Sequence, residues 1–319
     1  MKYWVLFLLV CNLCGVCAQT MMYADCSRKG IPFAKDPSVI KFEDRFLMYY
    51  SLPPSIDNSK SWGIGIAVSN NLVDWEKIGE INSDSSYVCE QVGICAPCAI
   101  MRNDTIHLFY QTYGMGKSDA ICHAFSTDGV TFERNGTNPI FSPDGDWNCG
   151  RAIDAEVYLF NGNYYLYYAT RDKSYQKQII GVAMAGKNTN FNREEWTDGV
   201  DAPILIPELE WEGNCIEAPS IVVYKGLMYM FYAGNYNNCP QQVGVAVSQD
   251  GLHWKRCFKE PFLRCGEVDS WNSSESGHPC IFTDNGEYTL FYQGNNDNGK
   301  TWWLSNRKVT WENKYPVLK

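Results

Sequence analysis

The stretch Asn214-Cys215-Ile216-Glu217-Ala218-Pro219-Ser220-Ile221-Val222-Val223-Tyr224 decides the fold. It places one carboxylate and then a proline in front of an apolar, β-branched run, and a Lys225-Gly226 turn leads into a second run that ends at Tyr232. Two such runs around a short glycine-containing turn predict a β-hairpin with an acid at its entrance. Similar hairpins begin at Asp36 and Asp154, so three hairpins start with a carboxylate.

The hairpin recurs along the chain. Its second strand ends in an aromatic triplet, and the tyrosines of these triplets follow one another at about 60 residues. They are Tyr49, Tyr110, Tyr168, Tyr232 and Tyr292. Each copy continues with a third strand and a turn to an aromatic-tipped fourth, as in the segment from Gly244 to Trp254, where Asp250-Gly251 is a typical hairpin turn. Five copies of four antiparallel strands predict an all-β fold, a five-bladed β-propeller.

A further recurring phrase joins the copies. It runs from a proline to a tryptophan, in segments 139–147, 203–211 and 261–271. We expect these segments to lead from the rim of one blade back to the axis, with Trp147, Trp211 and Trp271 packed between blades; stacking on a sugar ring is the alternative. Trp62 lies outside this phrase and is the better candidate for a substrate platform.

The chain begins with features of a secretory signal peptide. Lys2 precedes an apolar run from Trp4 to Cys11, and Val16-Cys17-Ala18 has the small residues of a cleavage site. We expect residues 1–18 to be removed and residues 19–319 to form a single propeller domain, secreted and extracellular. The net charge of −9 argues against nucleic acid and other polyanionic ligands. We expect no membrane partner and a monomer.

Eleven of the fourteen cysteines remain after the signal. In an oxidising compartment they are expected to form loop disulfides, for example Cys89 with Cys95 or Cys98, and Cys257 with Cys265, although connectivity cannot be read from a sequence. An odd count leaves one thiol over. Three sequons, at Asn103, Asn135 and Asn272, suit a secreted glycoprotein and would mark exposed turns if they are glycosylated.

The starts of the innermost strands carry the chemistry. Counting back about 14 residues from each tyrosine predicts the first residue of each innermost strand, because these strands repeat with the blades. The positions are Asp36, Ala96, Asp154, Glu217 and His278, and proline follows in four copies. The inner strands of a propeller line its axis, so three carboxylates and a histidine should share one cavity.

Carboxylates held together in a partly desolvated cavity cannot all stay ionised, so one should keep its proton near neutral pH while another remains charged. This is the condition for paired acid and base catalysis on a glycosidic bond. For any single one of these acids, a solvated or turn-capping group is the alternative. For the whole chain, the alternatives are a carbohydrate-binding propeller without activity and a protein-interaction propeller.

The motifs Asp36-Pro37-Ser38-Val39, Ile153-Asp154, Ile216-Glu217-Ala218-Pro219 and Gly277-His278 resemble those of glycoside hydrolase family 43 and the related propeller glycosidases. The resemblance implies that Asp36 is the general base, that Glu217 is the general acid and that Asp154 orients the acid and raises its pKa, in an inverting mechanism without a required cofactor. His278 matches a family histidine that helps to hold a cation or water, which suggests a structural Ca²⁺; a histidine that plugs the channel is the alternative.

Two departures from the family pattern keep alternatives open. Ala155 follows Asp154 where many members have proline, and Arg151 resembles part of the Arg-Asp-Pro motif of the retaining fructosidases. A retaining fructosidase-like or an anhydro-galactosidase-like hydrolase therefore stands beside the inverting reading. We expect Trp62, Arg151 and His278 to bind substrate. The resemblance favours α-L-arabinofuranosyl or β-D-xylosyl linkages of plant or algal polysaccharides or oligosaccharides.

Overall fold

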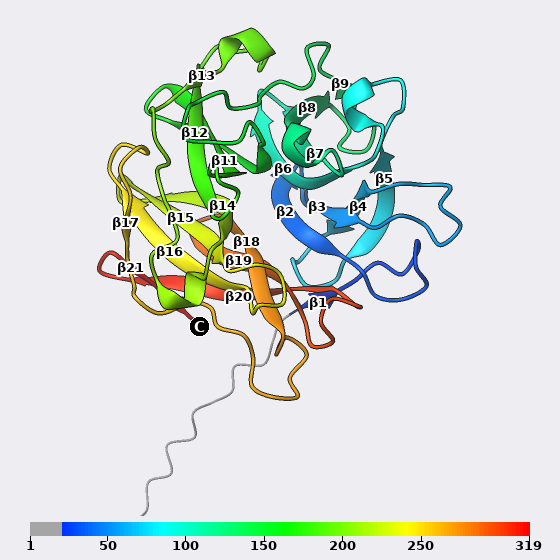
Figure 1. The fold of residues 1–319 in the computed structure, drawn as a ribbon. Helices are drawn as coiled ribbons and strands as arrows, with labels where there is room; N and C mark the ends of the chain where they lie inside the picture. The colour runs from blue at the N-terminus through cyan, green and yellow to red at the C-terminus, as the bar shows by residue number, and fades with distance from the viewer. Residues whose placement is uncertain (1–20) are drawn as a thin grey trace, which may run out of the picture.

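The computed structural model describes residues 21–319, which form five antiparallel sheets around one axis (Figure 1). The predicted all-β, five-bladed β-propeller is confirmed. The helical elements of the described residues are single 3₁₀ turns: η1 (Val88–Glu90), η2 (Gly116–Ser118), η3 (Arg193–Glu195) and η4 (Glu210–Glu212). None of them is long and apolar enough to cross a membrane. The predicted signal peptide lies outside the described residues.

Four blades consist of consecutive strands in sequence order from axis to rim. Blade 1 contains β2 (Lys35–Phe42), β3 (Arg45–Leu52), β4 (Gly63–Ser69) and β5 (Glu76–Asn82). Blade 2 contains β6 (Ile94–Arg102), β7 (Thr105–Thr112), β8 (Ile121–Ser126) and β9 (Glu133–Arg134). Blade 3 contains β10 (Ile153–Phe160), β11 (Asn163–Arg171), β12 (Gln178–Gly186) and β13 (Thr197–Asp198). Blade 4 contains β14 (Ile216–Tyr224), β15 (Leu227–Gly234), β16 (Gln242–Ser248) and β17 (Lys255–Arg256).

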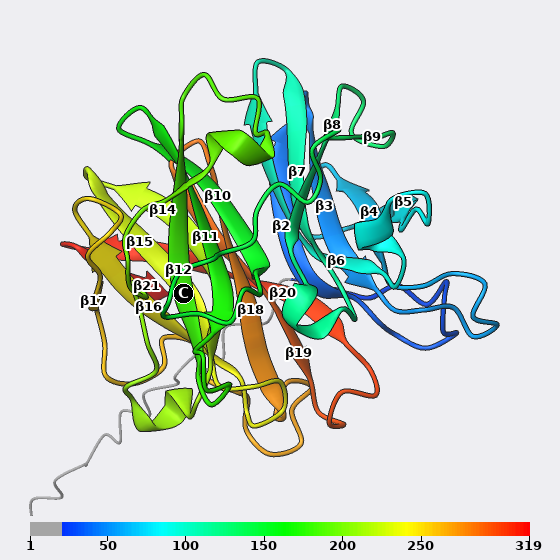
Figure 2. The same ribbon diagram turned by 45° about the horizontal axis from the view of Figure 1, so that its top comes forward.

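The fifth blade joins both ends of the described chain. Its strands are β18 (Glu275–Asp284), β19 (Glu287–Asn295) and β20 (Trp303–Glu312). The outer edge of β20 pairs with β1 (Met22–Tyr23) at Leu304 and with β21 (Tyr315–Leu318) at Val309. Figure 2 shows the innermost strands β2, β6, β10, β14 and β18 side by side around the axis. Blade 5 therefore combines strands from both ends of the described chain, each paired with β20.

Every innermost strand has a β-bulge near its start. In blade 1 the register with the second strand shifts between Lys35 and Ser38, and the other four blades have the same shift at the equivalent residues. The residue that follows the last pair before the register shift has a positive φ of 47° to 54° in all five blades. These residues are Asp36, Ala96, Asp154, Ala218 and His278. A bulge re-aims the side chain of its extra residue and ends the regular alternation of the strand.

This register corrects two positions predicted from the sequence. The residue of blade 4 that is equivalent to Asp36 is Ala218, and Glu217 lies one residue earlier, at the position of Lys35 in blade 1. In blade 1, Tyr50 and not Tyr49 is equivalent to Tyr110, because Ser38 pairs with Tyr49 where Cys98 pairs with Phe109. A fixed count along the chain could not detect a shift of one residue.

Side chains also link neighbouring inner strands below the bulges. The hydroxyl oxygen of Ser38 accepts the backbone N–H of Ala99 at 2.9 Å, and that of Ser220 accepts the N–H of Ile281 at 3.0 Å. At the equivalent position of blade 3, Glu156 Oε1 accepts the N–H of Ile221 at 2.7 Å. Burial raises the pKa of Glu156 to about 7. These side-chain acceptors thus link the innermost strands of neighbouring blades.

An acid, a tyrosine and a base recur toward the outside of three blades. In blade 4, Tyr232 donates to Glu212 at 2.6 Å and Arg256 pairs with Glu212 at 2.7 Å. In blade 2, Tyr110, Glu90 and Arg134 make the same contacts, and in blade 1, Tyr50, Asp25 and Lys77 do so. In each case the acid precedes the blade in sequence, so the cluster ties the incoming crossing segment to the sheet.

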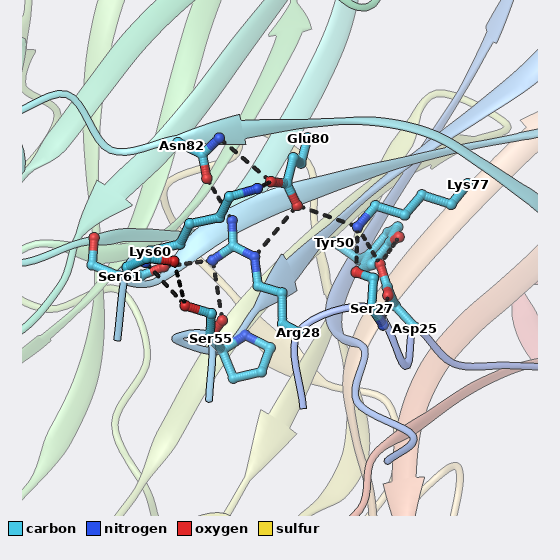
Figure 3. A network of polar contacts seen from close by, with 12 residues as sticks. Asp25, Ser27, Arg28, Tyr50, Ser55, Lys60, Ser61, Lys77, Glu80 and Asn82 are labelled. Carbon is cyan, nitrogen blue, oxygen red and sulfur yellow. Dashed lines mark hydrogen bonds and ion pairs between the residues drawn. The ribbon is translucent and has the colours of Figure 1, made fainter. Parts of the chain in front are cut away.

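The N-terminal segment is held to blade 1 by a polar network (Figure 3). Arg28 is 5% exposed; it donates to Asn82 at 2.6 Å and to the carbonyl oxygen of Pro53 at 3.1 Å, and it pairs with Glu80 at 3.4 Å. Lys77 bridges Glu80 and Asp25 at 3.2 and 2.8 Å. The segment that carries β1 to blade 5 is therefore anchored on blade 1.

The crossing tryptophans pack between blades, as predicted: Trp147, Trp211 and Trp271 are partly buried against three of the blade cores. A Cβ on Gly234 would come within 2.2 Å of the Trp211 ring, so only glycine allows this approach. The three tryptophans therefore add to the packing between neighbouring blades.

The structure does not show the expected loop disulfides, and only one of the three sequons lies on an exposed turn. Asn135 and Asn272 are buried, 6% and 9% exposed, so of the three sequons only that at Asn103 marks an exposed turn. The predicted pairing of Cys89 with Cys95 or Cys98 does not occur, because Cys95 and Cys98 are buried within β6 and Cys98 Sγ lies 3.3 Å from Glu156 Oε2. Cys265 Sγ contacts the carbonyl oxygen of Gln241 at 3.4 Å, and Cys257 is also a free thiol.

Candidate active site

Three of the predicted site residues meet at the axis. His278 Nε2 lies 3.3 Å from Asp36 Oδ1 and 3.4 Å from Asp154 Oδ1. All three occupy the positive-φ position of their bulges, which aims their side chains toward the centre. One imidazole nitrogen therefore faces two carboxylates that come from different blades.

Glu217 is held by two glutamines. Gln241 Nε2 donates to Oε1 at 2.6 Å, and Gln178 Nε2 donates to Oε2. Cys215 Sγ lies 3.6 Å from the same Oε2. Glu217 is 6% exposed, so these contacts fix the direction of a carboxyl group that has little water around it.

The two carboxyl groups with proposed catalytic roles have opposite pKa shifts. Burial, and next the negative charge of Asp154, raise the pKa of Glu217 to about 7. Burial also acts to raise the pKa of Asp36, but the positive charges of His278 and Lys35 outweigh it and lower that pKa below its usual value. Near neutral pH the site therefore offers one carboxylic acid and one carboxylate.

His278 supplies a positive charge between the acids. Burial acts to lower its pKa, but Asp36 and Asp154 outweigh burial and raise it to about 9. The imidazolium then donates from Nε2 toward both carboxylates, while its buried Nδ1 has no hydrogen-bond partner. These contacts favour the alternative in which the His278 side chain fills the central channel.

The arrangement does not fit the expected calcium ion. Ca²⁺ takes six to eight oxygen ligands, and within residues 21–319 no group of three His, Cys, Asp or Glu side chains is placed to hold a metal. The carboxylates of Asp36 and Asp154 instead face a protonated imidazole. The positive charge that a cation would supply here comes from the protein itself.

Two charged residues of the site were missed from the sequence. Lys35 Nζ lies 3.9 Å from Asp36 Oδ1 and 4.5 Å from the centroid of the Trp302 ring. Glu275 is fully buried; it accepts from Gln293 Nε2 at 2.7 Å, and burial raises its pKa to about 7. Neither residue is one of the five strand starts that the repeat predicts, so the repeat does not point to them.

The glutamines at the ends of the second strands were also missed, although the sequence held a signal. The tetrapeptide Leu-Phe-Tyr-Gln occurs twice, ending at Gln111 and at Gln293. Gln111 Oε1 accepts the backbone N–H of Asp154 at 2.8 Å, and Gln293 Oε1 accepts that of Asp36 at 2.9 Å. Each glutamine thus fixes the backbone of a site aspartate from the neighbouring blade.

Trp62 and Arg151 are the two other residues predicted to bind substrate. The ring of Trp62 packs on Tyr113 with centroids 5.0 Å apart, and Tyr113 lies within electrostatic reach of Lys35 and Asp36. Arg151 pairs with the buried Asp119 at 3.3 Å. Trp62 and Arg151 are both partly exposed.

A small cavity of about 20 Å³ lies along the axis, lined among others by Asp154, Glu156, Ser220 and His278. This volume suffices for about one water molecule, and the lining offers it polar partners.

A five-bladed propeller whose axis holds a buried carboxylic acid, a carboxylate and a bridging imidazolium has the machinery of a propeller glycoside hydrolase. Residues 31–313 match the model of Glycosyl hydrolases family 43. The chain belongs to this family and is a glycoside hydrolase, with a carbohydrate substrate.

The comparisons with known proteins agree on the fold. The structure is similar to a thermostable family-43 glycoside hydrolase with a TM-score of 0.73 and 23% identity, covering 93% of this chain and 96% of that one. It is similar to an endo-1,4-beta-xylanase from Bacteroides thetaiotaomicron with a TM-score of 0.71 and 19% identity, covering 90% and 94%. A GH32 beta-fructofuranosidase from Bombyx mori has a TM-score of 0.68 and 16% identity, covering 91% and 63%.

Two curated proteins are similar in sequence, one of them over less than half of its length. The sequence is 26% identical over 142 residues to a 1,2-beta-oligomannan phosphorylase from a Thermoanaerobacter species, which covers 40% of this chain and 44% of that protein. It is 20% identical to an uncharacterized protein of Mycobacterium tuberculosis over 271 residues, 79% of this chain and 84% of the relative.

Proposed function

We propose that the protein hydrolyses O-glycosidic bonds in a single displacement that inverts the anomeric carbon, with Glu217 as general acid and Asp36 as general base. The opposite pKa shifts of these two buried groups carry the proposal. An acid with a pKa near 7 keeps a proton for the leaving oxygen at neutral pH. A carboxylate with a lowered pKa stays ionised and can take a proton from water.

The neighbours have supporting roles in this scheme. Asp154 is the largest influence on the Glu217 pKa after burial, which is the effect expected of the third acid. His278 joins Asp36 to Asp154 and holds both in place. Gln178 and Gln241 each donate to one oxygen of the Glu217 carboxyl group and so hold its orientation.

The proposed substrates are α-L-arabinofuranosides or β-D-xylosides of plant or algal polysaccharides or oligosaccharides. Support comes from the family and from the similarity to a structure described as an endo-1,4-beta-xylanase. Trp62 and Arg151 would contact the sugar at the margin of the site. We also propose that the enzyme is secreted and acts as a monomer.

A substrate panel tests this proposal. Nitrophenyl glycosides and arabino- and xylo-oligosaccharides should include at least one substrate that the enzyme turns over. Binding of a sugar without turnover of any of them would support the carbohydrate-binding alternative and contradict the proposal.

Phosphorolysis is a second candidate, because a cation lies beside the proposed base and one relative is named a phosphorylase. Lys35 Nζ is 3.9 Å from Asp36 Oδ1, a position from which it could also attract an anionic nucleophile. Running the panel with and without inorganic phosphate separates the two. A sugar phosphate as product would show that phosphate, and not water, is the nucleophile. The rate of hydrolysis should not depend on the phosphate concentration.

Glu217→Gln should lower kcat by orders of magnitude for an alkyl or sugar leaving group, because glutamine cannot donate the proton that this leaving group needs. A dinitrophenolate needs little protonation, so hydrolysis of a dinitrophenyl glycoside should keep most of its rate. Steady-state kinetics on both substrates measure the difference.

Asp36→Asn is the matched comparison. It should slow both substrates, because no leaving group compensates for a water that is not activated. Equal losses on both substrates for Glu217→Gln would contradict the assignment of Glu217 as the acid.

A further inference from the structure

Two of the free thiols lie against each other beside the third strand of blade 2. Cys89 Sγ and Cys122 Sγ are 3.9 Å apart, although 32 residues lie between them in the sequence. Cys89 is partly exposed in η1, within the crossing from β5 to β6, and Cys122 is buried in β8. The contact therefore joins a crossing segment to the third strand of the blade that the segment enters.

The backbones on both sides of this contact are fixed. Glu90, next to Cys89, accepts hydrogen bonds from Tyr110 at 2.5 Å and from Arg134 at 3.0 Å. Cys122 pairs with Tyr110 in the register of the sheet, at the position held by glycine in blades 1, 3 and 4 and by Ser305 in blade 5. Blade 2 thus has the Cys122 side chain at this position, and it faces the Cys89 thiol of the crossing segment.

We propose that Cys89 and Cys122 form a disulfide bond when the protein meets an oxidised low-molecular-weight disulfide such as oxidised glutathione. A disulfide requires sulfurs about 2.05 Å apart, so closure from the observed separation takes a small movement of the partly exposed Cys89 side chain.

The chemistry balances in two exchange steps. The Cys89 thiolate attacks one glutathione sulfur, which expels a glutathione thiolate and leaves a mixed disulfide on Cys89. The Cys122 thiol then loses its proton and attacks Cys89 Sγ, which expels the second glutathione. Two protein thiols are oxidised and one glutathione disulfide is reduced.

The two thiols suit this order of events. The hydrogen bond from Cys122 lowers the pKa of Cys89, so the partly exposed thiol is the better first nucleophile. The pKa of Cys122 is raised by the same hydrogen bond and by burial, which favours its role as the second, intramolecular partner. This inference does not depend on the proposed function.

The bond would also secure the margin of the active site. Gly93, four residues after Cys89, forms a parallel bridge with Trp62, and Tyr113 donates its backbone N–H to the Gly93 carbonyl at 2.9 Å. A covalent link in the same crossing would hold this aromatic group in position.

Peptide mapping tests the proposal. The full-length folded chain, purified under reducing conditions and then desalted, is incubated with oxidised glutathione, denatured, alkylated without reduction, and digested with trypsin and a Glu-specific protease. Cleavage after Glu90 separates Cys89 from Cys95 and Cys98. Peptide 81–90 should appear joined to peptide 118–133, with the mass of the two thiol peptides less two hydrogen atoms.

Cys122→Ser provides the control, because serine is the residue of blade 5 at this position. In that variant Cys89 should retain glutathione, since the second exchange has no partner. Cys239→Ser removes an exposed thiol far along the chain and should leave the cross-link unchanged. Alkylated Cys89 and Cys122 in the oxidised wild type, or Cys89 joined to a different cysteine, would overturn the proposal.

Discussion

For single residues, the chemistry of the site depends on two carboxyl groups whose surroundings shift their pKa values in opposite directions. Glu217 has Asp154 nearby and two neutral amides as hydrogen-bond partners, so burial dominates and its acid form is favoured. Asp36 has Lys35 and His278 beside it, so its charged form is favoured. The same side-chain chemistry thus gives a proton donor and a proton acceptor.

Gln241→Met should move the basic limb of the pH profile of kcat/KM to higher pH. The amide of Gln241 stabilises ionised Glu217, and a hydrogen bond to a charged group is worth about 1.5–3 kcal/mol, which corresponds to roughly one or two pKa units. The wild-type limb should fall near the Glu217 pKa of about 7. An exposed change, Gln249→Met, should leave the limb in place; an unmoved or lowered limb in Gln241→Met would contradict this role.

The sequence could predict the acids but not all of their partners. Asp36, Asp154 and His278 stand at the starts of strands that recur at about 60 residues, and proline directly follows Asp36 and His278, so this pattern is visible in the sequence. The role of Lys35 and Glu275 depends on their contacts in the folded protein. Glu275 is linked to Asp36 by Gln293, which donates to Glu275 and accepts the backbone N–H of Asp36. Such a contact depends on the packing of blade 5 against blade 1, which no local pattern records.

At the level of strands, the β-bulge explains why Ala218, and not Glu217 as the repeat predicts, is equivalent to Asp36. The bulge residues need a positive φ, which aspartate and histidine adopt at the axis in three blades and alanine in the other two. In blade 4 the acid stands on the preceding, paired residue. It therefore approaches the axis from a different direction from Asp36 and Asp154.

Arg256→Met should destabilise the protein by about 3–5 kcal/mol, because it leaves the fully buried Glu212 without its ion-pair partner. Lys308→Met is the comparison: its pair with Glu287 is largely exposed and should be worth less than about 1 kcal/mol. Urea unfolding of both variants gives the two free energies. Similar small losses in both would mean that the acid, tyrosine and base clusters do not hold the crossings.

At the scale of the whole molecule, the ring closes through both ends of the described chain. The repeat of about 60 residues in the sequence predicts five blades. It does not predict that β1 and β21 share the edge of β20, because both strands are short and lie outside the repeat. The N-terminal segment is additionally tied to blade 1 through Arg28 (Figure 3).

The buried acids predict greatest stability at mildly acidic pH. Glu156, Glu217 and Glu275 have pKa values raised from 4.5 to about 7, so the folded state binds more protons than the unfolded state in this range and stability falls as pH rises through it. The raised pKa of His278 acts in the same direction between 6.5 and about 9.

Groups with lowered pKa values, such as Asp36 and Glu212, lose their stabilising contribution as the pH falls to the acidic extreme. The unfolding free energy should therefore be largest at roughly pH 4–6 and decline toward pH 9. Calorimetric Tm values across this range provide the measurement. A Tm maximum at pH 8 or above would show that these acids are not held protonated in the folded protein.

The most direct test of the central claim is the configuration of the first product. Inversion requires Asp36 to activate water while Glu217 protonates the leaving oxygen, with the two carboxyl groups roughly 6.5–9.5 Å apart; a retaining pair stands at roughly 5–5.5 Å. ¹H NMR of an aryl glycoside of defined anomeric configuration, recorded before the released sugar mutarotates, distinguishes the two outcomes. We predict that the inverted anomer appears first. First appearance of the retained anomer would contradict the account and make Asp36 a nucleophile, as in the fructosidase-like alternative.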